Sequence, residues 1–137
     1  MEKVIEARVI IDVPFHDTDP MAVVWHGNYF KYFEVARSKL LRSIDYDYPD
    51  MRDSHYAYPV IDCGCRFAHP VHYGEKIEVV ARVLEYENRL KIGYEVFHVD
   101  TGKRVSKGYT VQVAVDMRIP EMLLVSPDIL LEKLGVK

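Results

Sequence analysis

Residues 27–44, GNYFKYFEVARSKLLRSI, decide the fold, because they form the one long stretch with helical spacing ahead of the C-terminal residues. Apolar side chains recur there every three to four positions, at Tyr29, Phe33, Ala36, Leu40 and Ile44. Basic residues occupy the other faces of the same stretch. The pattern predicts a helix that is apolar on one side and is buried along a sheet.

The segments around this helix favour strands, since they are rich in β-branched residues and partly alternate between apolar and polar. We expect five strands, at residues 4–15, 57–68, 75–87, 91–99 and 104–116. Asp100-Thr101-Gly102-Lys103 predicts a hairpin turn in which glycine supplies the unusual backbone angle. Tight turns between consecutive strands imply antiparallel pairing. Residues 45–56, which are turn-rich and aromatic, are expected to form a loop.

The order of elements predicts an α+β protein with one domain spanning residues 1–137. A short helix is expected after Ser126-Pro127-Asp128, with Ser126 as its N-cap. A single long helix cannot cover a five-stranded sheet. We therefore expect an uncovered face or edge of the sheet to pair with another subunit in a homo-oligomer.

The composition excludes several classes of protein. A formal net charge of −3 and a pI near 6.1 give no general attraction to nucleic acid or anionic membranes, so an anionic ligand requires a local basic patch. The charged N-terminal residues are unlike a signal peptide, and no apolar stretch approaches the roughly 18 residues of a membrane-spanning helix. We expect a soluble, cytoplasmic protein without membrane insertion, in which Cys63 and Cys65 are reduced.

The stretch FHDTDPMAVVWHGNY, residues 15–29, gathers the candidates for chemistry where a loop enters the long helix. The first turn of a helix carries N–H groups without intrahelical partners, and these can hold a developing oxyanion. A carboxylate opposite them, from Asp17 or Asp19, could attack a carbonyl carbon or remove a proton from water. Gly27 would let a ligand approach closely. From the residues alone, both aspartates could equally cap turns.

A resemblance sharpens this interpretation. The run DTDPMAVVWHGNYFKYFEVAR, residues 17–37, resembles the signature of the hotdog-fold acyl-CoA thioesterases. It is most similar to the branch that contains 4-hydroxybenzoyl-CoA thioesterase and the Tol-Pal-associated thioesterases. The resemblance continues through Tyr58-Pro59-Val60, Phe67, Pro70 and the strand from Thr110 to Asp116. It implies a hotdog fold, in which a five-stranded antiparallel sheet wraps around one long helix, and a dimer or tetramer with active sites at a dimer interface.

The resemblance also implies the roles of individual residues. Asp19 matches the catalytic carboxylate, acting as nucleophile or general base, and the backbone N–H of His26 matches the oxyanion donor. The side chain of His26 matches a histidine implicated in activity. Trp25 and Tyr29 match pocket or helix-packing positions, and they are, with Gly27, the candidates for binding the substrate beside the catalytic residues. No metal or other cofactor is implied. The family usually has glycine where this chain has Ala22, so the course of the loop is expected to differ in detail.

Other charged residues allow alternatives. Asp17 is expected to be structural, accepting hydrogen bonds from N–H groups of the loop. Glu34 could replace Asp19, because some hotdog thioesterases use a helix glutamate, but an i, i+3 pair with Arg37 favours a salt bridge. Arg89 and Lys91 are candidates for holding the phosphates of coenzyme A, since the family tends to place basic residues there. An ordinary solvated turn is the competing interpretation.

The remaining histidines favour no metal site. His69 and His72 flank Pro70-Val71, but a metal needs three or four convergent ligands, and no spacing in the chain supplies them. His16 lies beside the two aspartates without completing such a set, and His98 is expected on a strand face. The aromatic residues of segment 45–58 could shape an acyl pocket, or could pack in the core or at a subunit interface.

The sequence thus predicts an enzyme that hydrolyses acyl-CoA to a free acid and coenzyme A. Two other functions stay open. One is a thioesterase whose partner is an acyl carrier protein, and the other is a non-catalytic acyl-CoA binding protein. A hotdog dehydratase would need a differently placed His and Asp motif, which the chain does not show.

Overall fold

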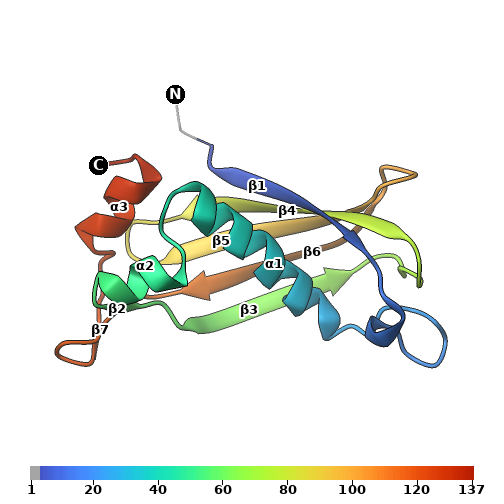
Figure 1. The fold of residues 1–137 in the computed structure, drawn as a ribbon, viewed down its shortest axis with the longest axis horizontal. Coiled ribbons are helices and arrows are strands. Elements are labelled where there is room, and N and C mark those ends of the chain that lie inside the picture. The colour runs from blue at the N-terminus through green and yellow to red at the C-terminus, as the bar shows by residue number, and fades with distance from the viewer. Residues whose placement is uncertain (1–3) are drawn as a thin grey trace.

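The computed structural model describes residues 4–137 and contains the predicted five-stranded antiparallel sheet (Figure 1). The strand order is β1-β4-β5-β6-β3, and every neighbouring pair is antiparallel. The bounds of these strands are Glu6–Asp12 for β1, Val60–Phe67 for β3, Lys76–Glu85 for β4, Leu90–His98 for β5 and Arg104–Gln112 for β6. Gly102, at a φ of 71°, turns the chain from β5 to β6 as predicted.

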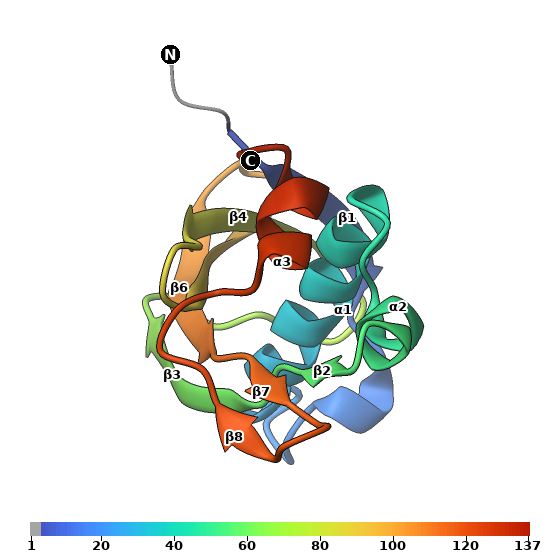
Figure 2. The ribbon, with the colours of Figure 1, turned by 90° about the vertical axis from the view of Figure 1, so that its left-hand side faces the viewer.

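Helix α1 (Asn28–Ser43) lies along the inner face of the sheet, and the sheet curves round it in the end view of Figure 2. Its apolar face is the predicted one, since Phe33, Ala36 and Leu40 are fully buried. The ring of Phe33 stacks on Tyr94 of β5, with centroids 4.4 Å apart and planes inclined by 7°. Burial of such side chains contributes roughly 1.5–3 kcal/mol each, which fixes the helix on the sheet.

The structure contains two further helices, so the prediction of a sheet around one long helix describes it only in part. The loop predicted over residues 45–56 was wrong, because α2 (Tyr48–Asp53) forms there. Asp47 caps it by accepting from the Tyr48 N–H (2.9 Å), and Asp50 accepts from the Asp47 N–H (3.0 Å). This capping box, with Pro49 in the first turn, was present in the sequence and favours a helix. Met51 anchors the helix in the core.

Helix α3 (Asp128–Leu134) is the predicted C-terminal helix, but Ser126 does not cap it. Pro127 is the N-cap residue, whereas the Ser126 N–H donates to the carbonyl oxygen of Glu87 (2.8 Å). The helix ends at Gly135, whose φ of 74° is in the left-handed region that glycine adopts readily.

Two of the predicted strands were too long. The strand predicted over residues 4–15 ends at Asp12, and a short 3-10 helix, η1 (Phe15–Asp17), follows it. The strand predicted over 104–116 ends at Gln112, whereas the strand expected within 57–68 ends at Phe67, as predicted. A second, three-stranded sheet consists of β2 (Tyr56–Ala57), β7 (Val115–Asp116) and β8 (Glu121–Met122).

Strand β3 lies at the edge of the main sheet, and β6 is its one neighbour among the described residues 4–137. Val60, Ile61 and Phe67 on this strand are 43%, 56% and 50% exposed. An edge strand with exposed apolar side chains is a surface on which another strand can pair. Among residues 4–137, no helix combines the length and the apolar composition needed to cross a bilayer.

Gly108 on β6 lies against the Phe33 side chain of α1, and replacing it should destabilise the fold. A Cβ atom there would lie 2.5 Å from the Phe33 ring and 2.6 Å from the Gly64 carbonyl oxygen. We expect Gly108→Ala to lower the free energy of unfolding by about 1–3 kcal/mol, measured by urea denaturation. Lys107→Ala, an exposed neighbour on the same strand, is the control and should change it little. Equal stability of Gly108→Ala and the wild type would contradict this account of the packing.

Candidate active site

Asp19 sits in a tight turn of the loop before α1, and the turn holds one of its carboxylate oxygens. Oδ1 accepts hydrogen bonds from the backbone N–H groups of Met21 (2.8 Å) and Val23 (3.2 Å). The main chain closes the turn, with the Asp19 N–H donating to the Val23 carbonyl (2.8 Å) and the Ala22 N–H donating to the Asp19 carbonyl (2.9 Å). Oδ2 makes no hydrogen bond within residues 4–137, so it is available to a ligand.

Asp17 fastens this loop to the helix. Its carboxylate is 3% exposed and accepts hydrogen bonds from Lys31 Nζ and from the hydroxyl of Tyr32 (2.7 Å), both on α1. Its backbone carbonyl accepts from the Trp25 N–H (3.0 Å) and from Asn28 Nδ2 (2.7 Å). The expected structural role agrees with this geometry. The expected donors, N–H groups of the loop, were wrong because side chains from the first turns of α1 reach the carboxylate.

The charge of Asp17 is stabilised by these contacts. Burial acts to raise the pKa of its carboxyl, but the hydrogen bonds from Lys31 and Tyr32 and the charge of Lys31 hold that pKa below its ordinary 3.8. For the same reason, burial and the bond to Asp17 raise the pKa of Tyr32 well above its ordinary value. Asp17 is therefore an ionised anchor, and its proton is not available for catalysis at neutral pH.

The start of α1 is left without a side-chain cap. Gly27 is the N-cap residue and makes no side-chain cap hydrogen bond. Within residues 4–137, the backbone N–H groups of His26 and Gly27 donate to no acceptor, whereas the next N–H, of Asn28, donates to the Trp25 carbonyl (2.9 Å). Such free N–H groups at the positive end of a 16-residue helix can stabilise an anion or an oxyanion.

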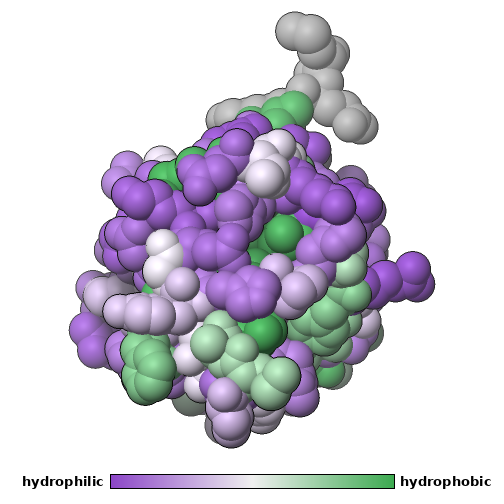
Figure 3. All heavy atoms as spheres, turned by 90° about the vertical axis from the view of Figure 1, so that its right-hand side faces the viewer, coloured by the Kyte–Doolittle hydropathy of each residue, from purple (hydrophilic) through white to green (hydrophobic). Residues whose placement is uncertain are grey.

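A pocket of about 320 Å³ brings Asp19 and the start of α1 together. It lies at the end of the molecule drawn in Figure 3, where apolar surface gathers below a polar region. One wall comes from the loop and the first turn of α1, and the other from the end of β3 and the residues after it. The lining residues are Asp19, Val23, Val24, Trp25, His26, Tyr29, Phe67, Ala68, His69 and Pro70.

Aromatic side chains shape this pocket. Phe67 meets Tyr29 edge to face, with centroids 5.1 Å apart, and His26 at 6.1 Å. The indole of Trp25 lies over Gly27, where a Cβ atom would come within 2.1 Å of the ring. Burial, with smaller effects from Cys65 and Glu75, raises the pKa of Tyr29 to about 12. Tyr29 therefore keeps its proton at neutral pH and can act only as a neutral hydrogen-bonding group.

The structure brings together some of the predicted site residues and separates others. Asp19, Trp25, His26 and Tyr29 line the pocket, and Gly27 lies directly behind Trp25. Arg89 and Lys91 do not reach it.

Both basic residues lie toward the other end of the sheet. Phe67 at the pocket pairs across the sheet with Ser106, and Ser106 pairs with Val96 on β5. Lys91 lies five residues from Val96 along β5, so it is roughly 17 Å from the end of the sheet that carries Phe67. The Arg89 Nε donates to Glu85 (2.7 Å), and Lys91 Nζ lies 5.2 Å from the ring centre of Tyr109.

Other sequence candidates lie outside the pocket. Glu34 is 68% exposed in its side chain and pairs with Arg37 at 3.3 Å, as the salt-bridge interpretation predicted. Among residues 4–137, no three His, Cys, Asp or Glu side chains converge as metal ligands. His72 and His98 both contact Glu75 instead.

The sequence did not single out Phe67, Ala68, His69 and Pro70 as pocket residues. They approach Asp19 through tertiary contacts, such as the Val24 N–H donating to the Val71 carbonyl (2.8 Å). No local pattern predicts such contacts.

Ala22 is the residue at which the chain departs from the family pattern, and its backbone explains why glycine is usual there. Its φ of 61° lies in the left-handed region, which costs a residue with a Cβ roughly 1 kcal/mol. The turn around Asp19 nevertheless closes with all the hydrogen bonds described above, so the alanine is accommodated.

The aromatic segment 45–58 divides between core and pocket. Tyr46 and Tyr58 are buried and lie within hydrogen-bonding distance of each other, with their hydroxyls 3.0 Å apart. Tyr48, Met51, Tyr56 and Tyr58 line a larger, mostly apolar pocket of about 710 Å³ between α2, β2 and β7. This pocket lies at the N-terminal end of β3, whereas the Asp19 pocket lies at its C-terminal end.

A curved antiparallel sheet that wraps around a helix is the architecture of the hotdog fold. Comparisons with known proteins agree. Residues 13–132 match the model of the family described as the Thioesterase-like superfamily. The protein named "Putative acyl-CoA thioesterase YneP" from Bacillus subtilis is 30% identical over 107 residues, 77% of each chain.

Solved structures give the same result. The DHNA-CoA thioesterase from Staphylococcus aureus is 28% identical and superposes with a TM-score of 0.79 over 87% of this chain and 80% of that one. Slr0204, a 1,4-dihydroxy-2-naphthoyl-CoA thioesterase from Synechocystis, shares the fold, with 17% identity, a TM-score of 0.84 and coverage of 95% and 96%. The chain belongs to the Thioesterase-like superfamily and is a thioester hydrolase.

Asp17→Asn should weaken the fold at neutral pH and change its response to acid. Because the folded pKa of Asp17 lies below 3.8, its contribution to stability is present above pH 3.8 and is lost as the pH falls through the folded pKa. We expect the variant to lose about 1.5–3 kcal/mol of unfolding free energy at pH 7. The deficit should shrink toward pH 3. Urea denaturation at both pH values measures this.

Asp53→Asn is the matched control, since Asp53 is exposed and its one ion pair within residues 4–137, with the exposed Arg52, is long at 4.0 Å. A deficit for Asp17→Asn that is the same at pH 7 and pH 3 would show that the carboxylate contributes no charge-dependent stability.

Proposed function

We propose that this protein hydrolyses acyl-CoA thioesters to a free acid and coenzyme A, with Asp19 as the catalytic carboxylate and the His26 backbone N–H as the oxyanion donor. One observation carries the proposal: Asp19, whose Oδ2 accepts no hydrogen bond from residues 4–137, and His26, whose backbone N–H donates to none of them, line the same pocket. A carbonyl placed between them would have an attacking group on one side and donors on the other.

Two routes fit this arrangement. As a general base, Asp19 takes a proton from water, whose oxygen attacks the carbonyl carbon. The resulting oxyanion accepts from the His26 N–H, the C–S bond breaks, and the proton passes to the departing thiolate. As a nucleophile, Asp19 attacks the carbonyl carbon itself and displaces the thiolate, and water then cleaves the mixed anhydride to return the carboxylate.

The other pocket residues would bind the substrate. Trp25 and Tyr29 provide flat apolar surface, and Tyr29 also supplies a neutral hydroxyl. Gly27 allows the indole of Trp25 to lie against the start of α1, which narrows the pocket beside the N–H groups. The ring of His26 is exposed at the mouth of the pocket, where it can contact the thioester or the water.

The active form would be a homodimer or a dimer of dimers. Two copies related by a two-fold axis pair the same edge antiparallel, so the C-terminal end of one β3 would meet the N-terminal end of the other. That arrangement would set the Asp19 pocket of one subunit beside the apolar pocket at Tyr48 and Tyr58 of its partner, which could receive the acyl group. The cytoplasmic location expected from the sequence stays a prediction.

The identity of the thiol is the finer part of the proposal. Lys91 of the same or the partner subunit is retained as a candidate for the phosphates of coenzyme A, whereas Arg89 is neutralised by Glu85. The two alternatives are hydrolysis of thioesters carried on an acyl carrier protein and binding of acyl-CoA without hydrolysis. Assignment to the 4-hydroxybenzoyl-CoA and Tol-Pal-associated branch rests on the motif of residues 17–37. A thiol-release screen over short, long, branched and aromatic acyl-CoA substrates would separate these possibilities.

Asp19→Asn should remove most turnover, because the amide can neither attack the carbonyl nor accept a proton from water. We expect kcat to fall by a factor of 100 or more on any acyl-CoA that the wild type hydrolyses, followed by thiol release. Asp53→Asn, exposed on α2, is the control and should keep wild-type turnover. Near-normal hydrolysis by a correctly folded Asp19→Asn protein would contradict the assignment of Asp19 as the catalytic carboxylate.

Ile61→Lys should disrupt the proposed subunit contact, since a charge on the exposed edge of β3 opposes strand pairing. Sedimentation analysis should show the wild type as a dimer or larger and the variant shifted toward monomer, with lower turnover. Ile119→Lys, an equally exposed residue (55%) outside the main sheet, is the control. A wild-type protein that is monomeric and fully active would contradict the proposal.

A further inference from the structure

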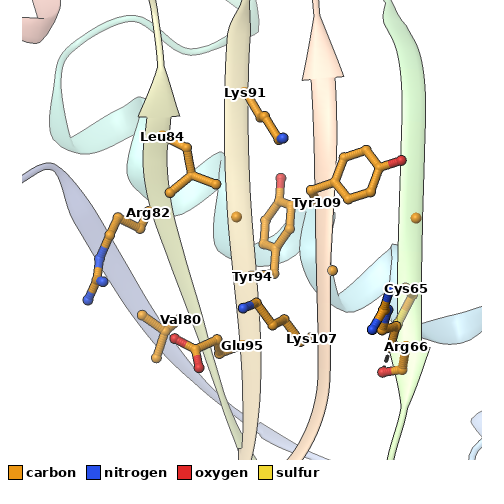
Figure 4. Close-up of a pocket in the computed structure, with 13 residues that line it drawn as sticks. Cys65, Arg66, Val80, Arg82, Leu84, Lys91, Tyr94, Glu95, Lys107 and Tyr109 are labelled. Atoms are coloured by element: carbon orange, nitrogen blue, oxygen red, sulfur yellow. Dashed lines mark hydrogen bonds between the residues drawn. The ribbon is translucent and has the colours of Figure 1, made fainter.

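A second groove lies on the opposite face of the sheet from α1, outside the candidate active site. It has a volume of about 490 Å³ and is formed by the middle of β4, β5, β6 and β3 (Figure 4). Leu84 lies over Gly93, where a Cβ atom would come within 2.8 Å of Leu84 Cδ1. Tyr109 lies over Gly64 in the same way, at 2.7 Å. The two glycines thus let a leucine and a tyrosine lie flat, as apolar walls of a shallow site.

Four cations and one carboxylate, that of Glu95, line the groove. Within residues 4–137, Arg66, Lys91 and Lys107 have no acidic partner within 4.0 Å, although all three line the groove. Other cations on this face are paired, including Arg82 with Glu6 (2.8 Å) and Arg104 with Glu95 (3.0 Å). The groove is therefore locally positive on a chain whose net charge is −3.

One end of this groove lies across β3 from the candidate active site. Arg66 and Phe67 are consecutive on β3, so their side chains point to opposite faces, Arg66 into the groove and Phe67 into the Asp19 pocket. Lys107 is the cross-strand partner of Arg66. Lys91 pairs with Val111, four residues farther along β6, and marks the other end roughly 13 Å away.

We propose that this groove holds the nucleotide part of a coenzyme A thioester whose acyl end is hydrolysed at Asp19. The inference rests on the proposed function. The phosphates would bind to Arg66 and Lys107, beside the active site, and to Lys91. The base would lie against Leu84 and Tyr109, since an aromatic ring and an aliphatic side chain offer the flat apolar contact that it needs. This reassigns the phosphate contacts from Arg89, which Glu85 neutralises, to Arg66 and Lys107.

Charge and size favour this occupant over others. A second copy stacked groove against groove would bring like charges together without partners, which is destabilising. An acidic carrier protein would also meet the three cations. However, a groove of 490 Å³ with flat apolar walls has the dimensions of a small-molecule site. The sequence alone offered no signal for Arg66 and Lys107, because they are far apart in the chain and the strand register brings them together.

The test compares two substrates that differ only in the nucleotide. Lys107→Glu and Arg66→Glu should raise KM for an acyl-CoA about tenfold, the effect of losing one charge-assisted phosphate contact. Neither variant should change kcat/KM for the same acyl group carried on pantetheine, which lacks the nucleotide. Lys133→Glu on α3 makes the same change of charge away from the groove and should leave both substrates unaffected.

Binding of adenosine 3′,5′-bisphosphate, measured by calorimetry, tests the groove even if no thioester is cleaved. The wild type and Lys133→Glu should bind it, and Lys107→Glu should bind at least tenfold more weakly. Equal loss of activity on acyl-CoA and acyl-pantetheine, or unchanged binding by the variants, would overturn the proposal. A loss confined to acyl-carrier-protein substrates would overturn it in favour of a protein partner. If Asp19→Asn kept its hydrolytic activity, the proposed function would be rejected. The binding of adenosine 3′,5′-bisphosphate would then decide by itself whether the groove is a nucleotide site.

Discussion

The contact on which the rest of the site depends is the buried carboxylate of Asp17 bound by Lys31 and Tyr32. It joins the loop to the first turns of α1, and its backbone carbonyl holds Trp25 and Asn28 at the helix entrance. A buried carboxylate is expensive unless it is paired and hydrogen-bonded, and here both conditions are met by residues of the helix. The position of the Asp19 turn relative to the start of α1 is therefore held by the hydrogen bonds that the carboxylate and the backbone carbonyl of Asp17 accept.

Asp17 and Asp19 have different roles because their surroundings differ. Asp17 accepts bonds from two side chains and is almost completely buried, so its charge is used to hold structure. Asp19 has one oxygen held by backbone N–H groups, while the other stays free at the pocket. The free N–H groups at the start of α1 complete the arrangement, since α1 lacks the side-chain cap that would otherwise occupy them. The absence of a side-chain cap usually weakens a helix, but in α1 it leaves backbone N–H groups that can donate to a substrate.

Glycine residues determine how closely large side chains can approach both faces of the sheet. Gly108 lets Phe33 approach β6 on the inner face, whereas Gly64 and Gly93 let Tyr109 and Leu84 lie flat on the outer one. Large side chains beside glycines thus create a tight helix contact on one side and a shallow groove on the other. The pocket at Asp19 and this groove meet at β3, where Phe67 and Arg66 face opposite ways. The edge strand is consequently the element that connects chemistry, substrate binding and subunit pairing in the proposed function.

The sequence by itself determined the helix, the five antiparallel strands and the cluster of candidates at residues 15–29. These features depend on short-range periodicity, turn residues and a local motif, all of which can be read along the chain. It missed α2 although the capping box around Asp47 was visible, because the aromatic and turn residues of that segment suggested a loop. Only the tertiary structure decided that Phe67 to Pro70 close the pocket and that Lys31 and Tyr32 bind Asp17. It likewise decided that Lys91 lines the same groove as Arg66 and Lys107. These contacts arise from strand register and helix packing between segments that are distant in the chain, so a local sequence pattern cannot predict them.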